Sequence, residues 1–158
     1  MLGLKLHRFI DSFTDSHEEV REAKHLAARS LGKLAGIVTD IYFDYFLAKH
    51  FADYHSDPLF VYAHAAYSTI EKNEYLIPEE MIPMVRAMIR QDWLTGYATF
   101  EGIDTTFQRL SRRVAYLEPI QSAGEDLRAN EAFYYEKFLL FFPQLQARSA
   151  QFIAENAA

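Results

Sequence analysis

The chain has 158 residues, of which 50% are hydrophobic and 15% aromatic, with only 6 Gly and 5 Pro. This composition excludes disordered and collagen-like chains, and the length suits one domain with a buried core. The absence of cysteine excludes disulfides and thiolate metal sites, and the net charge of −6 argues against a dedicated nucleic-acid binder. Charged residues interrupt every apolar run, so we expect no membrane span. The first eight residues contain no long apolar segment and no small-residue cleavage site, so we expect no signal peptide. An acidic chain without cysteine and without a signal is typical of the cytoplasm.

Helical periodicity runs through the whole sequence, with no strand alternation and no hairpin signal. We therefore predict an all-α fold, with a single compact bundle of about seven or eight helices over residues 1–158. In chain order, the expected helices cover residues 3–13, 16–31, 37–54, 58–71, 78–94, 99–116 and 119–142.

Turn and capping residues set several of these boundaries. Ser16 followed by Glu19 is typical of a capping box at the start of the second helix. Asp57 before Pro58 is typical of an N-cap followed by a proline at the first helical position. Pro143 is expected to break the last long helix or to begin a final segment.

The densest group of polar residues lies in the first fifteen positions. His7 and Asp11 are four residues apart, so on a helix they share a face, and they are suitable ligands for Mn²⁺, Mg²⁺, Fe²⁺ or Zn²⁺. Arg8 could contact a phosphate oxygen, and Asp15 completes the group. The alternative is structural: His7 and Asp11 form a hydrogen bond along the helix, while Arg8 pairs with a nearby Glu.

Asp40 and Asp44 form a second pair four residues apart, within an apolar and aromatic helix. Carboxylates are costly to bury there unless they are paired or bound to a metal, although they could also lie on a solvated stripe. A His/Asp pair on one helix and an Asp/Asp pair on another could face each other around one cation.

A basic cluster follows later in the chain. It consists of Arg109, Arg112 and Arg113, which could dock an acidic protein or a phosphate, or could be a solvated face. The single tryptophan, Trp93, is interpreted as a core anchor.

Several segments together resemble the acyl carrier protein phosphodiesterase family. Residues 6–15 read Leu-His-Arg-Phe-Ile-Asp-Ser-Phe-Thr-Asp and are similar to the His-Arg-x-Ile-Asp-x-Phe-Thr-Asp signature of that family. Residues 40–48 resemble its second motif. Further landmarks follow in the same order at residues 92–94, 101–103, 109–113 and 141–143.

The resemblance implies a helical fold related to HD-type metal phosphohydrolases. It implies hydrolysis of the phosphodiester that joins 4′-phosphopantetheine to a serine of holo-acyl carrier protein, a protein of fatty acid biosynthesis. Mn²⁺ or Mg²⁺ would be the cofactor. The implied metal ligands are His7, Asp11 and Asp44; the implied catalytic residues are Arg8, Asp15 and Asp40; and Arg109, Arg112 and Arg113 would meet the acidic carrier protein.

Two departures from the family pattern shape these expectations. Family members carry a further stretch, with a Gly-Asn-x-x-x-Asp-Phe segment, before the His-Arg motif. Here Met1 stands almost directly before it, so we expect an N-terminally short domain without the ligands of that stretch. The apolar surface bared in this way could be covered in a homo-oligomer. Tyr45 also stands where the second motif usually has His.

Two other functions stay open at this point. One is an HD-like phosphohydrolase that acts on another phosphorylated small molecule, because a fold does not fix a substrate. The other is an inactive helical protein that binds a carrier protein or a second copy of itself.

Overall fold

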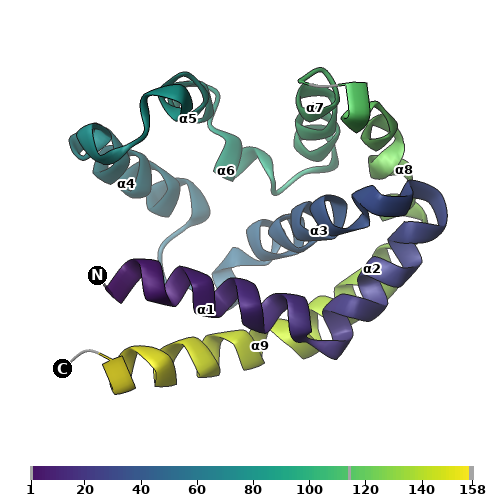
Figure 1. The fold of residues 1–158 in the computed structure, drawn as a ribbon, viewed down its shortest axis with the longest axis horizontal. Coiled ribbons are helices and arrows are strands. Elements are labelled where there is room, and N and C mark those ends of the chain that lie inside the picture. Colours follow the sequence, from purple (N-terminus) through teal and green to yellow (C-terminus); the bar gives the residue numbers. More distant parts are fainter. Residues whose placement is uncertain (1, 114, 157–158) are drawn as a thin grey trace. The chain divides into compact units, whose positions relative to one another are not determined.

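The computed structural model describes residues 2–113 and 115–156, and all the regular structure within those ranges is helical (Figure 1). The all-α prediction is therefore confirmed, whereas the relationship to HD-type hydrolases stays a prediction. Within the same ranges, no helix has the length and apolar character needed to cross a membrane. The α-helices are α1 (Leu2–Ser16), α2 (Glu18–Leu31), α3 (Ala35–Lys49), α4 (Leu59–Lys72), α5 (Ile82–Arg90), α6 (Trp93–Gly96), α7 (Phe100–Ser111), α8 (Ala123–Ala129) and α9 (Glu131–Asn156).

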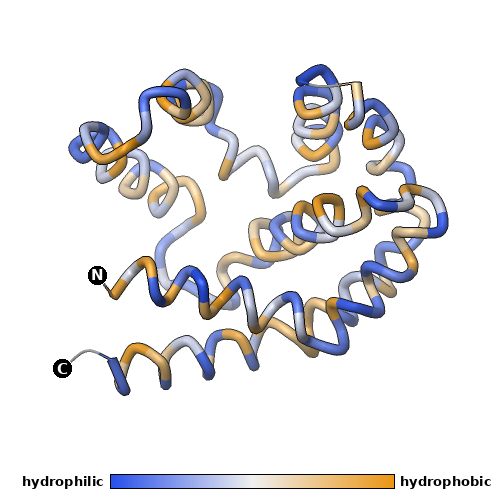
Figure 2. The backbone as a smooth tube through the Cα atoms, in the orientation of Figure 1, coloured by the Kyte–Doolittle hydropathy of each residue, from blue (hydrophilic) through white to orange (hydrophobic). Residues whose placement is uncertain are grey.

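The helices pack as two units, which are described separately. Unit 1 contains the residues up to Phe43 together with those from Glu125 onward, and unit 2 runs from Asp44 to Gly124. Helix α3 contributes to both units, and its apolar residues accordingly lie on several sides of the helix (Figure 2). The prediction that residues 1–158 form a single domain stays a prediction.

Unit 1 is built on the long helix α9, against which α1 and α2 pack (Figure 1). Aromatic side chains make much of this contact: the Phe9 ring stacks on Phe152 with centroids 4.7 Å apart, and Phe43 lies 5.8 Å from Phe138. The buried apolar residues of this core include Val20, Ala23, Ala27, Val38, Tyr42, Leu127, Tyr134, Phe138 and Phe141.

Unit 2 is built from short helices joined by 3₁₀ turns. Its fully or nearly buried side chains include Phe46, Tyr67, Ile103, Phe107 and Ile120. Helix α7 packs against the 3₁₀ segment η5 (Ala115–Ser122), and α6 packs against both α4 and α7. The predicted helix over residues 78–94 is divided here, because α5 ends at Arg90 and Asp92 adopts a left-handed conformation with φ 46°.

The start of α2 differs from the predicted capping box. The hydroxyl of Ser16 donates to the Ser12 carbonyl oxygen at 2.8 Å, so α1 continues through Ser16. His17 is the N-cap instead, and its Nδ1 accepts from the Glu19 backbone N–H at 3.3 Å. The prediction that Asp57 caps the fourth helix was also wrong, because the N-cap residue of α4 is Pro58.

Pro143 does not break the last helix, which continues through it to Asn156. Proline lacks the N–H that would donate to the carbonyl four residues earlier, at Leu139. Pro143 and Leu139 lie on the exposed side of α9, so water can satisfy that carbonyl. Helix α9 tolerates the proline because the missing hydrogen bond lies on its solvent-exposed face.

Candidate functional site

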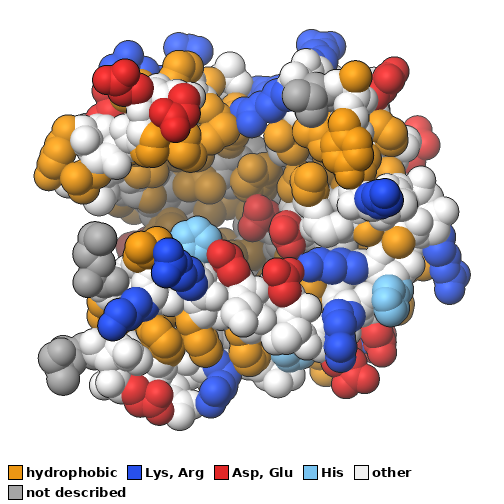
Figure 3. Space-filling model, viewed as in Figure 1, with side chains coloured by type: hydrophobic (Ala, Val, Ile, Leu, Met, Phe, Trp, Pro, Cys, Tyr) orange, Lys and Arg blue, Asp and Glu red, His pale blue; other side chains and the backbone are white. Residues whose placement is uncertain are grey.

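The first motif forms an exposed polar face on α1. His7 Nδ1 lies 3.0 Å from an Asp11 carboxylate oxygen, and the two side chains are 69% and 60% exposed. Figure 3 shows acidic, basic and histidine side chains together on the visible face of α1. This contact is the His7–Asp11 pairing along the helix that the structural alternative expects, and it also places an imidazole nitrogen and a carboxylate where they could share a cation.

Two more carboxylates of unit 1 belong to the same neighbourhood. Asp15 accepts from the Lys24 ammonium at 2.8 Å, which ties α1 to α2. Loss of hydration raises the pKa of Asp40 on α3, the Lys24 charge opposes this, and the nearby Asp15 and Asp11 carboxylates add to it. We call these residues, His7, Asp11, Asp15, Lys24 and Asp40, the acidic cluster.

The acidic cluster holds four of the six predicted catalytic and metal-binding residues. Arg8 lies exposed on the same helix as His7, and Asp44 belongs to unit 2. Within residues 2–113 and 115–156, no three His, Asp or Glu side chains are grouped closely enough to hold a metal ion. The chemistry of the donors fits a divalent cation, since His7 and Asp11 supply a nitrogen and an oxygen on one face. The metal site as a whole stays a prediction.

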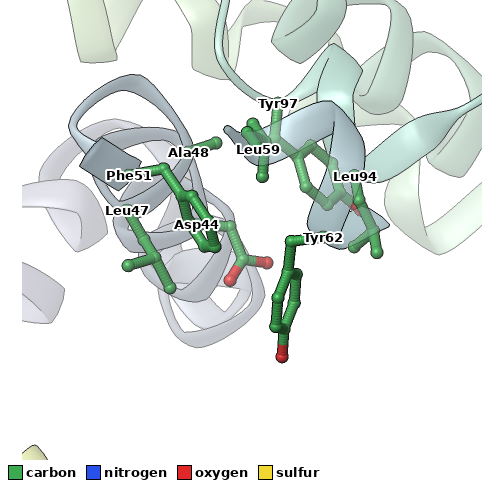
Figure 4. A pocket seen from close by; sticks show the side chains of 8 residues that line it. All are labelled: Asp44, Leu47, Ala48, Phe51, Leu59, Tyr62, Leu94 and Tyr97. Carbon is green, nitrogen blue, oxygen red and sulfur yellow. The ribbon is translucent and has the colours of Figure 1, made fainter. Parts of the chain in front are cut away.

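Asp44 lies in an apolar pocket of about 130 Å³ in unit 2 (Figure 4). The pocket is lined by Asp44, Leu47, Ala48, Phe51, Leu59, Tyr62, Leu94 and Tyr97. Figure 4 shows that the Asp44 carboxylate and the two tyrosine hydroxyls are the polar side-chain groups among these hydrocarbon walls. Asp40 and Asp44 are both exposed, as the solvated-stripe alternative expects, although the surroundings of Asp44 are apolar.

Tyr97 connects Asp44 with the predicted basic cluster. Burial raises the pKa of Tyr97, and the nearby Asp44 carboxylate raises it further. The positive charges of Arg109 and Arg113 lower it, so both guanidinium groups lie within electrostatic range of the phenol. Arg109 and Arg113 line a small cavity beside Tyr97. Arg112 is exposed and is not part of that lining.

Trp93 is part of this arrangement and is not the predicted core anchor. It is only half-buried, and the Arg109 guanidinium lies 5.4 Å from the centre of its ring. A guanidinium over an indole face is attracted by the ring electrons. The tryptophan therefore orients an arginine.

A buried tyrosine fixes the turn that presents Trp93 and Tyr97. The Tyr67 hydroxyl donates to an Asp92 carboxylate oxygen at 3.1 Å and accepts from the Leu94 backbone N–H at 2.9 Å. These bonds hold Asp92 in its left-handed conformation and begin α6 at the next residue. Burial raises the pKa of Tyr67 to about 12, so the hydroxyl remains a donor at neutral pH.

Sequence reasoning did not find Tyr67 or Tyr97. Both lie in stretches whose helical periodicity indicates only packing residues, and neither belongs to a recognised motif. The one available signal was proximity in sequence, because Tyr97 follows the Asp92–Leu94 landmark by three positions.

The fold is all-helical, and the acidic cluster of unit 1 supplies imidazole and carboxylate groups of the kind that hydrolases use. The family model described as acyl carrier protein phosphodiesterase matches residues 1–145, and the chain belongs to this family. An acyl carrier protein phosphodiesterase of Photorhabdus laumondii is 30% identical over 150 residues, which cover 93% of this chain and 75% of that protein. The protein of the same name from Salmonella agona is 30% identical over 153 residues, covering 94% and 78%. No solved structure matches.

Proposed function

We propose that this protein hydrolyses the phosphodiester between 4′-phosphopantetheine and the serine of holo-acyl carrier protein. The observation that carries the proposal is the family match over residues 1–145, which includes every predicted site residue. In the reaction, a water oxygen attacks phosphorus and the bond from phosphorus to the serine oxygen breaks. The products are apo-acyl carrier protein and free 4′-phosphopantetheine, and the serine oxygen takes up a proton.

The residues of the two family motifs would have different roles in this reaction. A divalent cation, Mn²⁺ or Mg²⁺, held by His7, Asp11 and Asp44 would supply a water of lowered pKa and would neutralise phosphate charge. Asp40 is the better candidate for the general base, because the Asp15 carboxylate is already engaged by Lys24. Arg8 would stabilise charge that develops on the phosphate oxygens.

Partner recognition would depend on charge. Arg109, Arg112 and Arg113 lie at the end of α7 and just beyond it, and they would meet an acidic carrier protein. A cysteine-free chain is compatible with the reducing cytoplasm that we propose as its location. Association into a homo-oligomer stays a prediction.

The first experiment measures the release of apo-carrier protein from holo-carrier protein with Mn²⁺ present. We expect His7→Ala and Asp11→Ala each to lower the rate at least about 100-fold, because each removes a proposed ligand of the cation that would activate the water. His25→Ala is the matched control, since His25 is exposed on α2 outside the acidic cluster.

Three outcomes would contradict the proposal. If His7→Ala and Asp11→Ala were as active as the control, the acidic cluster would not be catalytic. If the protein hydrolysed members of a nucleotide panel and left holo-carrier protein intact, its substrate would be another phosphorylated small molecule. If neither were hydrolysed, a non-catalytic binding protein would be the better description.

A further inference from the structure

Two cavities of unit 2 share one wall. The apolar pocket of about 130 Å³ around Asp44 includes Tyr97 in its lining, and so does a smaller cavity of about 40 Å³. The smaller cavity is lined by Trp93, Tyr97, Thr106, Arg109, Leu110 and Arg113. Tyr97 is therefore common to a hydrocarbon-lined space and a space lined by two arginines.

The smaller cavity has two basic side chains in its lining. Arg109 and Arg113 both line it, and the Arg109 guanidinium is held against the Trp93 ring. Two guanidinium groups present planar sets of N–H donors that match phosphate oxygens. Arg112 carries the same charge but is not part of the lining.

The apolar pocket is too small for a long ligand as a whole. An apolar cavity of about 150 Å³ holds one benzene molecule, so a pocket of about 130 Å³ has room for a branched group of a few carbon atoms. Among the residues that the structure describes, no cationic side chain lines this pocket, which leaves the arginine side as the place for a phosphate.

We propose that the two cavities form one binding site for the 4′-phosphopantetheine arm. Arg109 and Arg113 contact the phosphate, and the apolar pocket receives the carbon with two methyl groups that lies next to the phosphate in this arm. The identity of the arm rests on the proposed function, whereas the pairing of a phosphate side with an apolar side rests on the two cavities.

The site would also explain why the three arginines are not equivalent. Arg109 and Arg113 would recognise the small arm, and Arg112 would contribute only to the attraction of a charged partner. Tyr97, which lines both cavities, would contact the arm beside its phosphate, and Leu59 and Leu94 would be among the walls that contact the methyl groups.

The test is calorimetric titration with three probes: 4′-phosphopantetheine, pantetheine without the phosphate, and inorganic phosphate. We expect Arg109→Gln and Arg113→Gln each to weaken 4′-phosphopantetheine binding about tenfold or more, a change of about 1.4 kcal/mol, and to leave pantetheine binding unchanged. Leu59→Ala should weaken 4′-phosphopantetheine and pantetheine alike and leave inorganic phosphate unchanged.

Arg112→Gln is the matched variant, because it removes the same charge close by but outside the cavity. We expect it to change 4′-phosphopantetheine binding by less than about twofold at physiological salt. Arg109→Lys retains the charge and should recover part of the affinity, which separates a recognition role from misfolding. Circular dichroism melting checks the fold of each variant.

The inference would be overturned if 4′-phosphopantetheine did not bind, or if folded Arg109→Gln and Arg113→Gln bound it as the parent chain does. Equal losses in Arg112→Gln would also overturn it, since they would show only a general effect of charge. Hydrolysis of holo-carrier protein is measured separately. Hydrolysis without the expected binding pattern would contradict this inference and leave the proposed function standing. Binding without hydrolysis would contradict the proposed function and leave this inference standing.

Discussion

The Asp126 carboxylate accepts hydrogen bonds from two buried phenols of unit 1, at 3.0 Å from Tyr42 and 2.7 Å from Tyr134. Burial and the adjacent carboxylate raise the pKa of both tyrosines well above the usual range, so both hydroxyls remain donors. Asp126→Ala leaves the two hydroxyls buried without an acceptor, and we expect the free energy of unfolding to fall by about 2–4 kcal/mol. Urea denaturation measures this change.

Glu136→Ala is the control for this prediction. Glu136 is an exposed carboxylate on α9. Its removal should change the free energy of unfolding by no more than about 0.5 kcal/mol. Equal effects of the two substitutions would show that the Asp126 hydrogen bonds contribute little.

Tyr67 makes a prediction for alkaline pH. Its pKa is raised from 10.0 to about 12 in the folded chain, so the folded state holds a proton that the unfolded state loses first. This contribution to stability is complete below pH 10 and is lost as the pH rises toward 12. We expect Tyr67→Phe to show a shallower fall of unfolding free energy across that interval than the parent chain.

Tyr75→Phe is the matched control, because Tyr75 is 80% exposed. It should keep the slope of the parent chain. A Tyr67→Phe chain with the same alkaline slope as Tyr75→Phe would contradict the assignment of this proton to Tyr67.

Sequence spacing could predict contacts along one helix but not contacts between helices. His7 and Asp11 are one turn apart, so their contact follows from helix geometry. Tyr42 and Asp126 are 84 positions apart, and nothing in the local sequence indicates that they meet. Tyr97 is missed for the same reason, since its partners come from α3 and from α7 and the residues just beyond it.

At the scale of elements, Gly102 sets how closely α6 and α7 approach. A Cβ atom at Gly102 would lie 1.8 Å from the Gly96 carbonyl oxygen, which is backbone and cannot rotate away. We expect Gly102→Ala to destabilise the protein by about 1–3 kcal/mol and to weaken 4′-phosphopantetheine binding, because α6 carries Trp93 and Leu94. Thermal melting and the calorimetric titration measure the two effects.

Gly36→Ala is the matched substitution, because a Cβ atom there meets nothing within 4 Å. It should leave stability unchanged or raise it by up to about 1 kcal/mol, since alanine favours helix more than glycine. If Gly102→Ala behaved in the same way, the close approach of α6 and α7 would not be needed for the site.

Pro143 gives a second prediction for an element. Pro143→Ala restores an N–H that can donate to the Leu139 carbonyl on the exposed face of α9. We expect the free energy of unfolding to rise by about 1–3 kcal/mol. A decrease measured by urea denaturation would mean that α9 is shaped around the proline.

Helix existence could be predicted from periodicity, and helix ends could not be predicted equally well. The Ser16–Glu19 pattern has the right spacing for a capping box, yet His17 caps α2 because Ser16 bonds back to Ser12. A local pattern lists the groups that can cap, and competing hydrogen bonds decide which one does.

For the whole molecule, the distribution of charge predicts how association depends on salt. The chain carries a net charge of −6, so an acidic carrier protein is repelled except where Arg109, Arg112 and Arg113 lie. We expect kcat/KM for holo-carrier protein to fall steeply as ionic strength rises, and Arg112→Gln to flatten that dependence. The affinity for free 4′-phosphopantetheine should change less over the same range. If the salt dependence of kcat/KM were unchanged in Arg112→Gln, this arginine would not contribute to partner recognition.

The single tryptophan of the chain lies against Arg109 at the proposed phosphate side of the site. Indole emission is sensitive to a neighbouring cation and to the arrival of an anion that draws the cation away. When the protein is excited at the red edge of tryptophan absorption, its emission therefore comes from this one place, although it also contains 10 tyrosines. Fluorescence of the unlabelled protein can thus report arrival of the phosphorylated arm in real time, before any bond is broken.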